Sequence, residues 1–585
     1  MGKTIKRIRI NQLSSSNGVF DSIIFHDGIN LILGEKYDEN TTRGRKTNGV
    51  GKSMSIEFLD YCLLCDYDKS RISRIPRDVL SPETEIILDL GIGDDKVQIR
   101  RNVKNQDKPI IVRNDKETRF DKLSDARDYL TGIIFSDLSA DAIPSFRNLL
   151  SLLIRDEKSE FSDILKCYDV KRRIPDDLTT HLFMLGLSLE KYKKVSSTIK
   201  EIEKTQVSLT KVKAELTENG RKRIPDVRAE MNALEAEVQQ LELAIDAYKS
   251  NEAFDSIEEE LSEIESMLDQ LRRKQKALKR ELGKIKEMPK PEQVDDEEIE
   301  LVYNQFKENL GDAVVKSLNE VIGFKNKIEE FQRVIVNQKA RELEERIAEV
   351  ASQIRLLDDK YAEKMKILDT QGILKNLKTS FRIYESKKEE SSRTQFLFEQ
   401  YENYDKQKKR LAIIKSQELL EIDADIEGLS QELKSFMNTI LDIHEAIMGN
   451  RECSFEIKTK DTPQGKTPIE MNMRIFDDGS HSVDRTKVFI YDMALLFGEY
   501  TRTRHPLFLI HDNIFDVDQD TLVQCLNYVS KQEEHFADFQ YILTLNRDKI
   551  ENEERLRLIT MDVKEHQVAS FTKKNKFLKC DYQEI

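Results

Sequence analysis

Hydrophobic positions along the chain follow two kinds of pattern. Short apolar runs bounded by polar and turn residues, the pattern of β-strands, occur within residues 1–187 and again after residue 449, and helical stretches alternate with them. The long middle part instead repeats apolar residues at intervals of four and three, the pattern of a helix with one seam against a partner helix. The chain therefore predicts two α/β halves with long helices between them.

The middle part carries this seam twice. The first seam runs from Val227 to Ile285 and ends at MPKPEQ, where two prolines stop a helix. The second runs from Leu343 to Tyr361, after which charged helical sequence continues to about residue 445. Two such seams predict a coiled coil that runs out and back, and a continuous first seam would be about 90 Å long at a rise of about 1.5 Å per residue. A helical bundle with short loops and wider apolar stripes is the alternative.

The limits of the strand-rich ends and of the two seams divide the chain into five predicted parts. The parts are one half of a head at 1–187, an outgoing arm at 188–288, an apex at 289–320, a returning arm at 321–448 and the second half of the head at 449–585. Polar interruptions, which are candidate bends, occur at 219–226, 250–255 and 369–374.

Composition supports long solvated helices and argues against a membrane protein. Charged residues make up 35% of the 585 residues and hydrophobic residues 38%, against an average of about 25% charged. The chain has no uninterrupted apolar run of about 18 residues, and MGKTIKRIRINQ lacks the apolar stretch of a signal peptide. We expect a cytoplasmic protein with no membrane contact. The net charge of −14 argues against a protein whose whole surface binds nucleic acid. Binding through local basic patches is compatible with this charge.

The six cysteines do not form a zinc motif. Cys62 and Cys65 form a single CxxC, but it lies in the apolar run FLDYCLLC. Two buried helix thiols and a metal or redox site are the two interpretations of this run. Because there is no second CxxC and no histidine pair at zinc spacing, we expect reduced thiols.

The strongest local motif predicts a phosphate-binding loop. It follows the apolar run INLILG and precedes the helical run MSIEFLDYCLL, so it lies between a strand and a helix. Such a loop directs backbone N–H groups and a helix N-terminus at nucleotide phosphates, while its lysine neutralises the β- and γ-phosphates and its hydroxyl ligates Mg²⁺. The motif consists of Asn48, Gly49, Val50, Gly51, Lys52 and Ser53.

This loop departs from the G-x-x-x-x-G-K-[ST] pattern. Lys46 stands where the first glycine belongs, and Gly34 instead ends the strand, with EKYDENTTRGRKT inserted after it. An ordinary glycine-rich turn is the alternative interpretation. Arg43 and Arg45 in the insertion, together with Lys46, either contact phosphate or DNA or form a solvated loop tip.

A second motif predicts a carboxylate for the magnesium ion. The run Leu507–Asp512, LFLIHD, ends a strand with an aspartate, which would hold the Mg²⁺ shell, although an isolated strand-capping aspartate is the alternative. The next residue is Asn513, whose amide can orient water but cannot accept its proton. Hydrolysis should therefore be slow or use another carboxylate, for which Asp516 and Asp518 are the candidates.

With these two motifs at opposite ends of a coiled coil, the chain resembles, over its whole length, the SMC, RecF, RecN and double-strand-break-repair ABC ATPases. The segments NLILGEK…TNGVGKS, PSFRNLLSLLIRDEKSEF, HLFMLGLSLEK and LFLIHDNIFDVDQ are more closely similar to a bacterial family of short SMC-like ATPases. Members of that family accompany Lamassu-type antiphage systems and related three-component ABC systems. In that family His-Asp followed by a small polar residue replaces Asp-Glu, as His511, Asp512 and Asn513 do here.

The resemblance implies an α/β ABC-type ATPase head split by a long antiparallel α-helical coiled coil. It implies ATP and Mg²⁺ as ligands, and a homodimer whose heads sandwich two ATP molecules. It further implies a clamp on double-stranded DNA and partner subunits of a defence complex, including a nuclease effector. Because no cysteine lies between Cys167 and Cys453, a zinc hook is excluded, and any apex dimerisation would use packing near 289–320.

Further site residues follow only from the resemblance. Arg155 would lie near the ABC Q-loop and bind the nucleotide, although arginine replaces the usual glutamine. Asn546 would be a catalytic residue, since it stands where ABC heads carry a switch histidine. The segment 477–497 occupies the place of the signature loop but lacks Ser-Gly-Gly. Its polar residues would reach the γ-phosphate bound to a partner head or would simply begin a helix; they are Ser480, Ser482, Arg485 and Lys487.

Two rival functions remain open at this point. One is a repair or recombination ATPase of the RecN kind that acts without an effector. The other is a structural coiled-coil adaptor whose head binds nucleotide without hydrolysing it.

Overall fold

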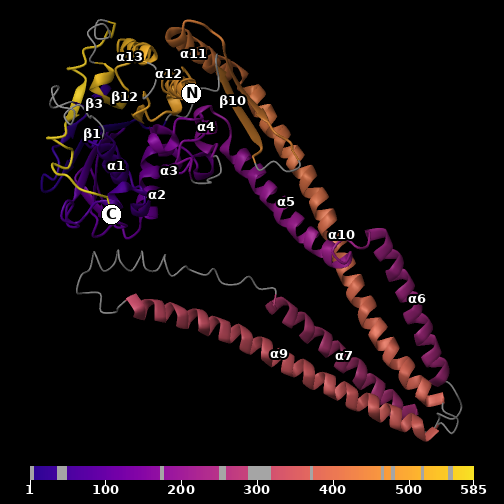
Figure 1. The fold of residues 1–585 in the computed structure, drawn as a ribbon. Coiled ribbons are helices and arrows are strands. Elements are labelled where there is room, and N and C mark those ends of the chain that lie inside the picture. The colour runs from indigo at the N-terminus through magenta and orange to yellow at the C-terminus, as the bar shows by residue number, and fades with distance from the viewer. Residues whose placement is uncertain are drawn as a thin grey trace. The chain divides into compact units, whose positions relative to one another are not determined.

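The fold consists of two compact units, which are described separately (Figure 1). The head comprises Met1–Lys200 and Ile413–Ile585, and the helical unit comprises Glu201–Ala412. The computed structural model describes residues 5–35, 49–171, 177–249, 258–286, 318–368, 373–462, 467–475, 481–515, 519–550 and 558–584.

A parallel sheet forms the centre of the head. Its strand order is β13-β3-β12-β11-β8, with every neighbouring pair parallel. The strands are β3 (Gly28–Gly34), β8 (Ile154–Arg155), β11 (Phe508–Asp512), β12 (Gln540–Asn546) and β13 (Gln567–Phe571). Strands β3, β11 and β12 are buried along their whole length, which explains their nearly unbroken apolar sequences. This sheet joins segments from both ends of the chain.

Helices pack around this sheet and complete the apolar core. They are α1 (Lys52–Cys62), α3 (Phe146–Leu153), α4 (Thr179–Met184), α11 (Ser430–Met448), α12 (His481–Phe497) and α13 (Gln519–Glu533). At the end of α1, Cys62 and Cys65 are both buried, and burial raises the pKa of each thiol to about 12. The interpretation of this CxxC as two buried thiols is confirmed.

A second, antiparallel sheet belongs to the head as well. Its order is β2-β1-β4-β5-β6-β7, and helix α2 (Leu123–Ile134) contributes its apolar face to the same core. The strands are β1 (Ile8–Ser15), β2 (Ile23–Ile24), β4 (Ile86–Ile92), β5 (Asp95–Arg101), β6 (Ile110–Arg113) and β7 (Lys116–Arg119). A hairpin of β9 (Cys453–Thr459) and β10 (Ile469–Ile475) forms a separate two-stranded sheet. The predicted α/β head, split in sequence by long helices, is confirmed.

Long helices make up the helical unit and pair in antiparallel fashion. They are α5 (Leu189–Leu216), α6 (Ile224–Lys249), α7 (Glu258–Lys286), α9 (Leu318–Leu368) and α10 (Ile373–Gly428), of which α5 and α10 also extend into the head. The two predicted seams meet between α7 and α9, where Leu268 and Val350 are buried in one apolar cluster. Polar contacts at both ends of this pair, Lys286–Glu344 and Tyr361–Glu265, give its antiparallel direction.

The first seam, which would be about 90 Å long if it were continuous, is divided between two helices that run in opposite directions. Helix α6 runs antiparallel to α10, as the Lys387–Glu237 ion pair at 2.6 Å and the Arg228–Glu402 ion pair at 2.7 Å show. Helix α7 instead runs in the same direction as α10, because Arg272 pairs with Glu385 and Lys279 pairs with Glu389 further along both helices. The α7–α9 pair therefore folds back along α10 (Figure 1).

Arg272 holds three of these helices together. From α7 its guanidinium lies 3.6 Å from Asp358 of α9 and 3.0 Å from Glu385 of α10, and it covers the ring of Phe381 at 4.7 Å. Burial and the nearby Glu385 raise the pKa of Asp358 to about 6, so this carboxylate depends on the cation beside it. A single seam cannot encode such a three-helix contact.

Three of the predicted features lie partly or wholly outside the described residues. The apex at 289–320 falls mostly within 287–317, and the interruption at 250–255 falls within 250–257. The interruption at 369–374 includes undescribed positions 369–372, after which α10 begins. The interruption at 219–226 is confirmed, because α5 ends at Leu216 and α6 begins at Ile224.

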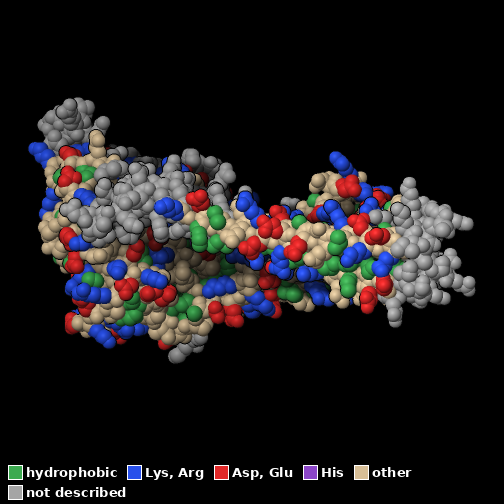
Figure 2. All heavy atoms as spheres, turned by 90° about the horizontal axis from the view of Figure 1, so that it is seen from below, with side chains coloured by type: hydrophobic (Ala, Val, Ile, Leu, Met, Phe, Trp, Pro, Cys, Tyr) green, Lys and Arg blue, Asp and Glu red, His purple; other side chains and the backbone are tan. Residues whose placement is uncertain are grey.

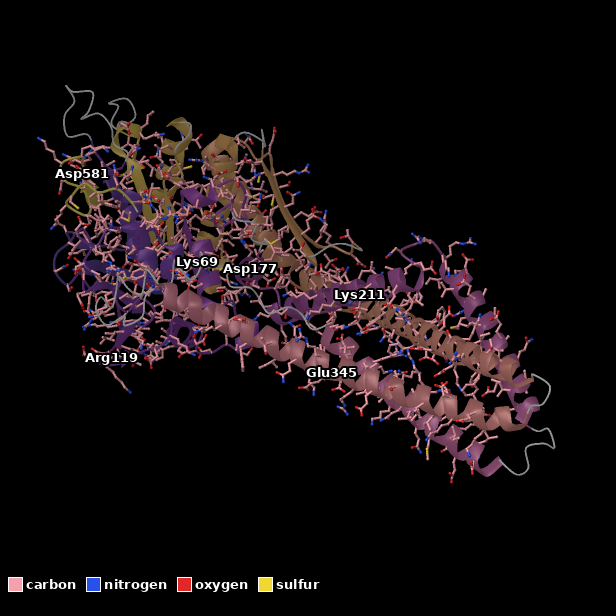
Figure 3. All side chains as sticks on the ribbon, turned by 60° about the horizontal axis from the view of Figure 1, so that its bottom comes forward. Lys69, Arg119, Asp177, Lys211, Glu345 and Asp581 are labelled. Carbon is pink, nitrogen blue, oxygen red and sulfur yellow. The ribbon has the colours of Figure 1, made fainter. Side chains whose placement is uncertain are left out.

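Charged side chains of both signs cover the surface. On the face drawn in Figure 2, Lys and Arg side chains lie among Asp and Glu side chains. Lys211 on α5 and Glu345 on α9 are examples of exposed charges on the long helices (Figure 3). Within the described ranges, no helix has both the length and the apolar character that crossing a membrane requires.

His566 provides a pH-dependent contact at the edge of the parallel sheet. Its Nε2 lies 3.0 Å from Glu533 Oε2, and Glu533 Oε1 accepts a hydrogen bond from the backbone N–H of Ile29 in β3 at 2.6 Å. The hydrogen bond to Glu533 raises the pKa of His566 to about 8, above about 6.5 in the unfolded chain. Its contribution to the free energy of unfolding is therefore complete below pH 6.5 and is lost as the pH rises through 8.

We predict that His566→Gln lowers the free energy of unfolding more at pH 6 than at pH 9. The difference between the two pH values should be about 1 kcal/mol, because partial exposure of the pair screens the interaction. Urea unfolding followed by circular dichroism measures it. The control His535→Gln changes an exposed histidine and should leave the pH dependence as in the wild type. Equal losses for His566→Gln at both pH values would contradict the prediction.

Candidate functional site

Gly51 marks the junction of the predicted phosphate-binding loop with α1. It is the N-cap residue of α1 and has a φ of 107°, a conformation that side chains with a Cβ rarely adopt. A Cβ at this position would also lie 2.5 Å from the Cβ of Phe577. Glycine is thus required here by both conformation and space. Residues 36–48, which include Asn48 and the basic insertion, lie outside the described part of the chain.

Lys52 begins α1 and meets two other predicted residues. Its side chain is largely buried, and Nζ donates a hydrogen bond to Oδ1 of Asn546 at the end of β12. A Cβ on Gly34 would lie 3.0 Å from Cδ of Lys52 and 3.1 Å from Oδ1 of Asn546. Gly34 therefore leaves the space that the lysine side chain occupies. The structure brings these three predicted residues together.

Ser53 and Asp512, the two predicted magnesium ligands, are hydrogen-bonded. Ser53 Oγ donates to Asp512 Oδ1 at 3.1 Å, although the residues are 459 positions apart in sequence. Thr544 Oγ1 donates to the same carboxylate oxygen at 2.5 Å. Burial raises the pKa of Asp512 to about 6, and the bonds from Thr544 and Ser53 oppose this rise. A hydroxyl and a carboxylate held together in this way fit Mg²⁺, which prefers oxygen ligands.

The residue after Asp512 contacts a carboxylate that sequence reasoning missed. Asn513 has a φ of 65°, and its Nδ2 donates a hydrogen bond to Glu157 Oε1 at 2.5 Å. Glu157 begins the short 3-10 helix Glu157–Ser159. Its only sequence signal was its position in PSFRNLLSLLIRDEKSEF, two residues after Arg155. The predicted bases Asp516 and Asp518 fall in 516–518, outside the described residues.

These groups line a cavity of about 510 Å³, a size typical of small-molecule sites. One side of the cavity is formed by the loop and the ends of the parallel strands, namely Gly49, Val50, Gly51, Lys52, Ser53, Met54, Glu157, Asn513 and Asn546. The other side is formed by Arg71 and the C-terminal segment, through Lys576, Phe577, Leu578, Cys580, Tyr582 and Glu584. On the loop side, the positive charge of Lys52 and the hydroxyl of Ser53 suit a magnesium-bound phosphate chain.

Sequence reasoning did not find the C-terminal wall of this cavity. The backbone N–H of Phe577 donates to the carbonyl of Val50 at 3.1 Å, and the Phe577 ring stacks on Phe20 at a centroid distance of 4.6 Å. Glu584 accepts a hydrogen bond from Nε of Arg71 at 3.1 Å. These contacts attach the last residues of the chain directly to the phosphate-binding loop, a tertiary arrangement without a local sequence pattern.

Arg155 is not a residue of the cavity, which corrects the prediction that it binds nucleotide. Its side chain is fully buried in β8, where Nη2 donates to Asp492 Oδ1 at 2.9 Å and to the carbonyl of Ile164 at 2.7 Å. The Nε atom lies 2.7 Å from Asp492 Oδ2. Arg155 thus forms an internal ion pair with α12 and is unavailable to a ligand.

His511 extends this ion pair to the strand that carries Asp512. Its Nε2 lies 3.0 Å from Asp492 Oδ2, and its Nδ1 lies 3.1 Å from the hydroxyl of Tyr541. Burial lowers the pKa of His511, so the ring is neutral and Nε2 donates while Nδ1 accepts. Burial would by itself raise the pKa of Asp492, but Arg155 and His511 together keep it below its usual value. The ionised Asp492 therefore joins α12, β8 and β11.

The predicted signature residues lie in or just before α12. Lys487 is largely buried and forms an ion pair with Asp484 at 3.3 Å. Arg485 Nη1 donates to the carbonyl of Asn513 at 3.4 Å, so this residue contacts the strand end of its own head. Ser480 and the side chain of Ser482 lie outside the described residues. The reach of these residues toward a partner head stays a prediction.

Comparison with known proteins gives one family match to part of the sequence and matches among solved structures. A protein family described as "Uncharacterised protein conserved in bacteria (DUF2326)" matches residues 443–582, and no curated protein matches the chain. Among solved structures, the Smc head domain with a coiled coil and joint from Pyrococcus yayanosii is 13% identical, with 94% of each chain covered and a TM-score of 0.35. The Smc head domain with an extended coiled coil from Pyrococcus furiosus, bound there to the C-terminal domain of ScpA, is 12% identical, with 94% of this chain and 92% of that chain covered and a TM-score of 0.33.

We predict that Asp492→Asn lowers the free energy of unfolding of the head by about 3–5 kcal/mol, because it leaves the buried charge of Arg155 without its carboxylate partner. The matched control is Asp442→Asn, since Asp442 forms an exposed ion pair with Arg451. The control should change stability by less than about 1 kcal/mol. Urea unfolding of both variants tests this, and equal losses would contradict the importance of the buried network.

Proposed function

We propose that the head binds ATP with Mg²⁺ and hydrolyses it slowly. The observation that carries this proposal is the meeting of Lys52, Ser53 and Asp512 from opposite ends of the chain, with Ser53 and Asp512 3.1 Å apart. Lys52 neutralises phosphate charge, and the hydroxyl and carboxylate hold a magnesium ion, which when bound stabilises negative charge on the phosphates. Asn546 orients the lysine ammonium. We expect slow turnover because Asn513, an amide in the place of a glutamate, cannot accept a proton from water.

We further propose that two heads form a homodimer around two ATP molecules and act on double-stranded DNA. Each site would combine the phosphate-binding loop of one chain with the α12 segment of the other. The support for this arrangement is the organisation of the chain. Two sequence-distant segments form one head, and a long helical unit is inserted between them in sequence. DNA binding would be independent of base sequence and sensitive to salt, as expected for contacts to phosphates.

The proposed biological role is antiphage or antiplasmid defence, in which ATP and DNA occupancy controls a partner such as a nuclease effector. Its support is the resemblance of four sequence segments to the short SMC-like ATPases of defence systems. A repair ATPase of the RecN kind shares the same site and would differ by lacking an effector. Asn513 supports the second rival, an adaptor that binds nucleotide without hydrolysing it, because an amide cannot accept a proton from water.

We predict that Lys52→Ala weakens ATP binding at least about tenfold, since the variant loses a charged contact to phosphate, and reduces phosphate release to background. The control Lys69→Ala removes an exposed lysine and should leave both unchanged. Equilibrium titration with a fluorescent ATP analogue and a phosphate-release assay give the two readings. Equal phosphate release by the wild type and Lys52→Ala would remove the enzyme assignment, while loss of binding alone would favour the adaptor.

We also predict that the protein binds linear or circular DNA, so that a filter retains the DNA or its band shifts in a gel. The logarithm of the binding constant should fall linearly with the logarithm of salt concentration, because each neutralised phosphate releases counterions. The assay is run with ATP, without nucleotide and with Lys52→Ala. Failure to bind either DNA form under all these conditions would exclude the clamp without affecting the assignment of ATP binding.

A further inference from the structure

A carboxylate lies directly beside the residue that replaces the usual catalytic glutamate. Asn513 follows the magnesium-ligand candidate Asp512, and its amide nitrogen donates to Glu157 Oε1 at 2.5 Å. Both residues line the same cavity as Lys52 and Ser53. The cavity therefore contains a proton acceptor next to the position where an amide can only orient water.

The lysine next to Glu157 in sequence pairs with other carboxylates. The neighbouring Lys158 forms ion pairs with Glu57 and with Asp156, the latter at 3.3 Å. Within the described part of the chain, Glu157 forms no ion pair and accepts its hydrogen bond from the neutral Asn513 amide. The Glu157 carboxylate is therefore not occupied by Lys158, the cation next to it in sequence.

The position of Glu157 is fixed from two sides. It comes two residues after Arg155, whose buried ion pair with Asp492 anchors the end of β8. Asp156 is the N-cap residue of the 3-10 helix that contains Glu157, and its Oδ1 accepts a hydrogen bond from the backbone N–H of Lys158 at 3.0 Å. On the other side, Asn513 extends directly from β11. A proton acceptor must lie within hydrogen-bond reach of the water it activates. These contacts hold the backbone on both sides of Glu157, and the bond from Asn513 directs its carboxylate.

We propose that Glu157 is the general base of ATP hydrolysis and that Asn513 holds it in place, an inference that rests on the proposed ATPase function. The water oxygen forms a bond to the γ-phosphorus while the bond from that phosphorus to the β–γ bridging oxygen breaks, and the electron pair of the broken bond leaves with ADP. The water proton moves to the Glu157 carboxylate and is afterwards released to solvent. Asn513 uses Nδ2 to hold Glu157, and its Oδ1 can accept the second hydrogen of the same water.

The first test is Glu157→Gln. Glutamine keeps an oxygen that accepts from Asn513 but cannot take the water proton, so phosphate release should fall at least about 100-fold, the lower range for a general base. ATP binding measured in EDTA and the thermal unfolding midpoint should stay at wild-type values. The matched control is Glu160→Gln, an exposed glutamate just after the same 3-10 helix, which should hydrolyse at the wild-type rate. All rates are measured with DNA present.

A second test exchanges the two groups. The double variant Glu157→Gln with Asn513→Glu places the carboxylate on β11 and the amide on the 3-10 helix, so the contact between them is kept. It should recover at least about tenfold over Glu157→Gln alone. A double variant no faster than the single one would overturn the assignment of this pair as the position of the base.

The remaining outcomes distinguish this inference from the proposed function. The role of Glu157 would be overturned if Glu157→Gln hydrolysed ATP at the wild-type rate. It would also be overturned if hydrolysis were lost only in Asp516→Asn or Asp518→Asn. Neither outcome would contradict ATP hydrolysis itself. A large loss of ATP binding by Glu157→Gln in EDTA would make Glu157 a binding residue and also overturn its role as base. If the wild type released phosphate no faster than Lys52→Ala, the proposed hydrolysis itself would be overturned.

Discussion

The hydrogen bond between Ser53 and Asp512 depends on a constraint that organises the whole head. Strands β3, β12 and β11 are adjacent and parallel, so their carboxyl ends meet at one edge of the sheet. Gly34 faces Asn546 across one strand pair, and Asp512 faces Thr544 across the next. A ligand that contacts the loop after β3 therefore also meets the ends of strands from the other end of the chain. Parallel sheets commonly bind ligands at this edge.

Below this edge, a buried ion pair decides which parts of the head are joined. Asp492 of α12 contacts Arg155 of β8 and His511 of β11, and all three side chains are almost completely inaccessible to water. A buried ion pair is weak evidence for net stability, since desolvation offsets much of the attraction. Its consequence here is geometric. The helix within the predicted signature segment, the strand that leads to Glu157 and the strand that carries Asp512 share one carboxylate.

The helical unit shows how far a hydrophobic repeat determines structure. The spacing of apolar residues requires each helix to bury one stripe against another helix, and the predicted antiparallel seams meet between α7 and α9. The repeat does not specify which further helix the pair will contact. A group outside the seam makes that contact, because Arg272, which pairs with Asp358 inside the α7–α9 pair, also pairs with Glu385 of α10.

Local sequence was sufficient where the chemistry depends on consecutive residues. The loop ending in Lys52 and Ser53 and the apolar strand ending in Asp512 were predictable, because backbone geometry and strand burial impose recognisable patterns on short segments. Arg155 was assigned to the wrong environment, and Glu157 and Tyr582 were not found at all. Their positions depend on contacts across hundreds of residues, with Asp492, with Asn513 and with the wall that closes the cavity. Only the folded chain decides whether a charged side chain faces a ligand or a buried partner, because either environment can satisfy the same residue type.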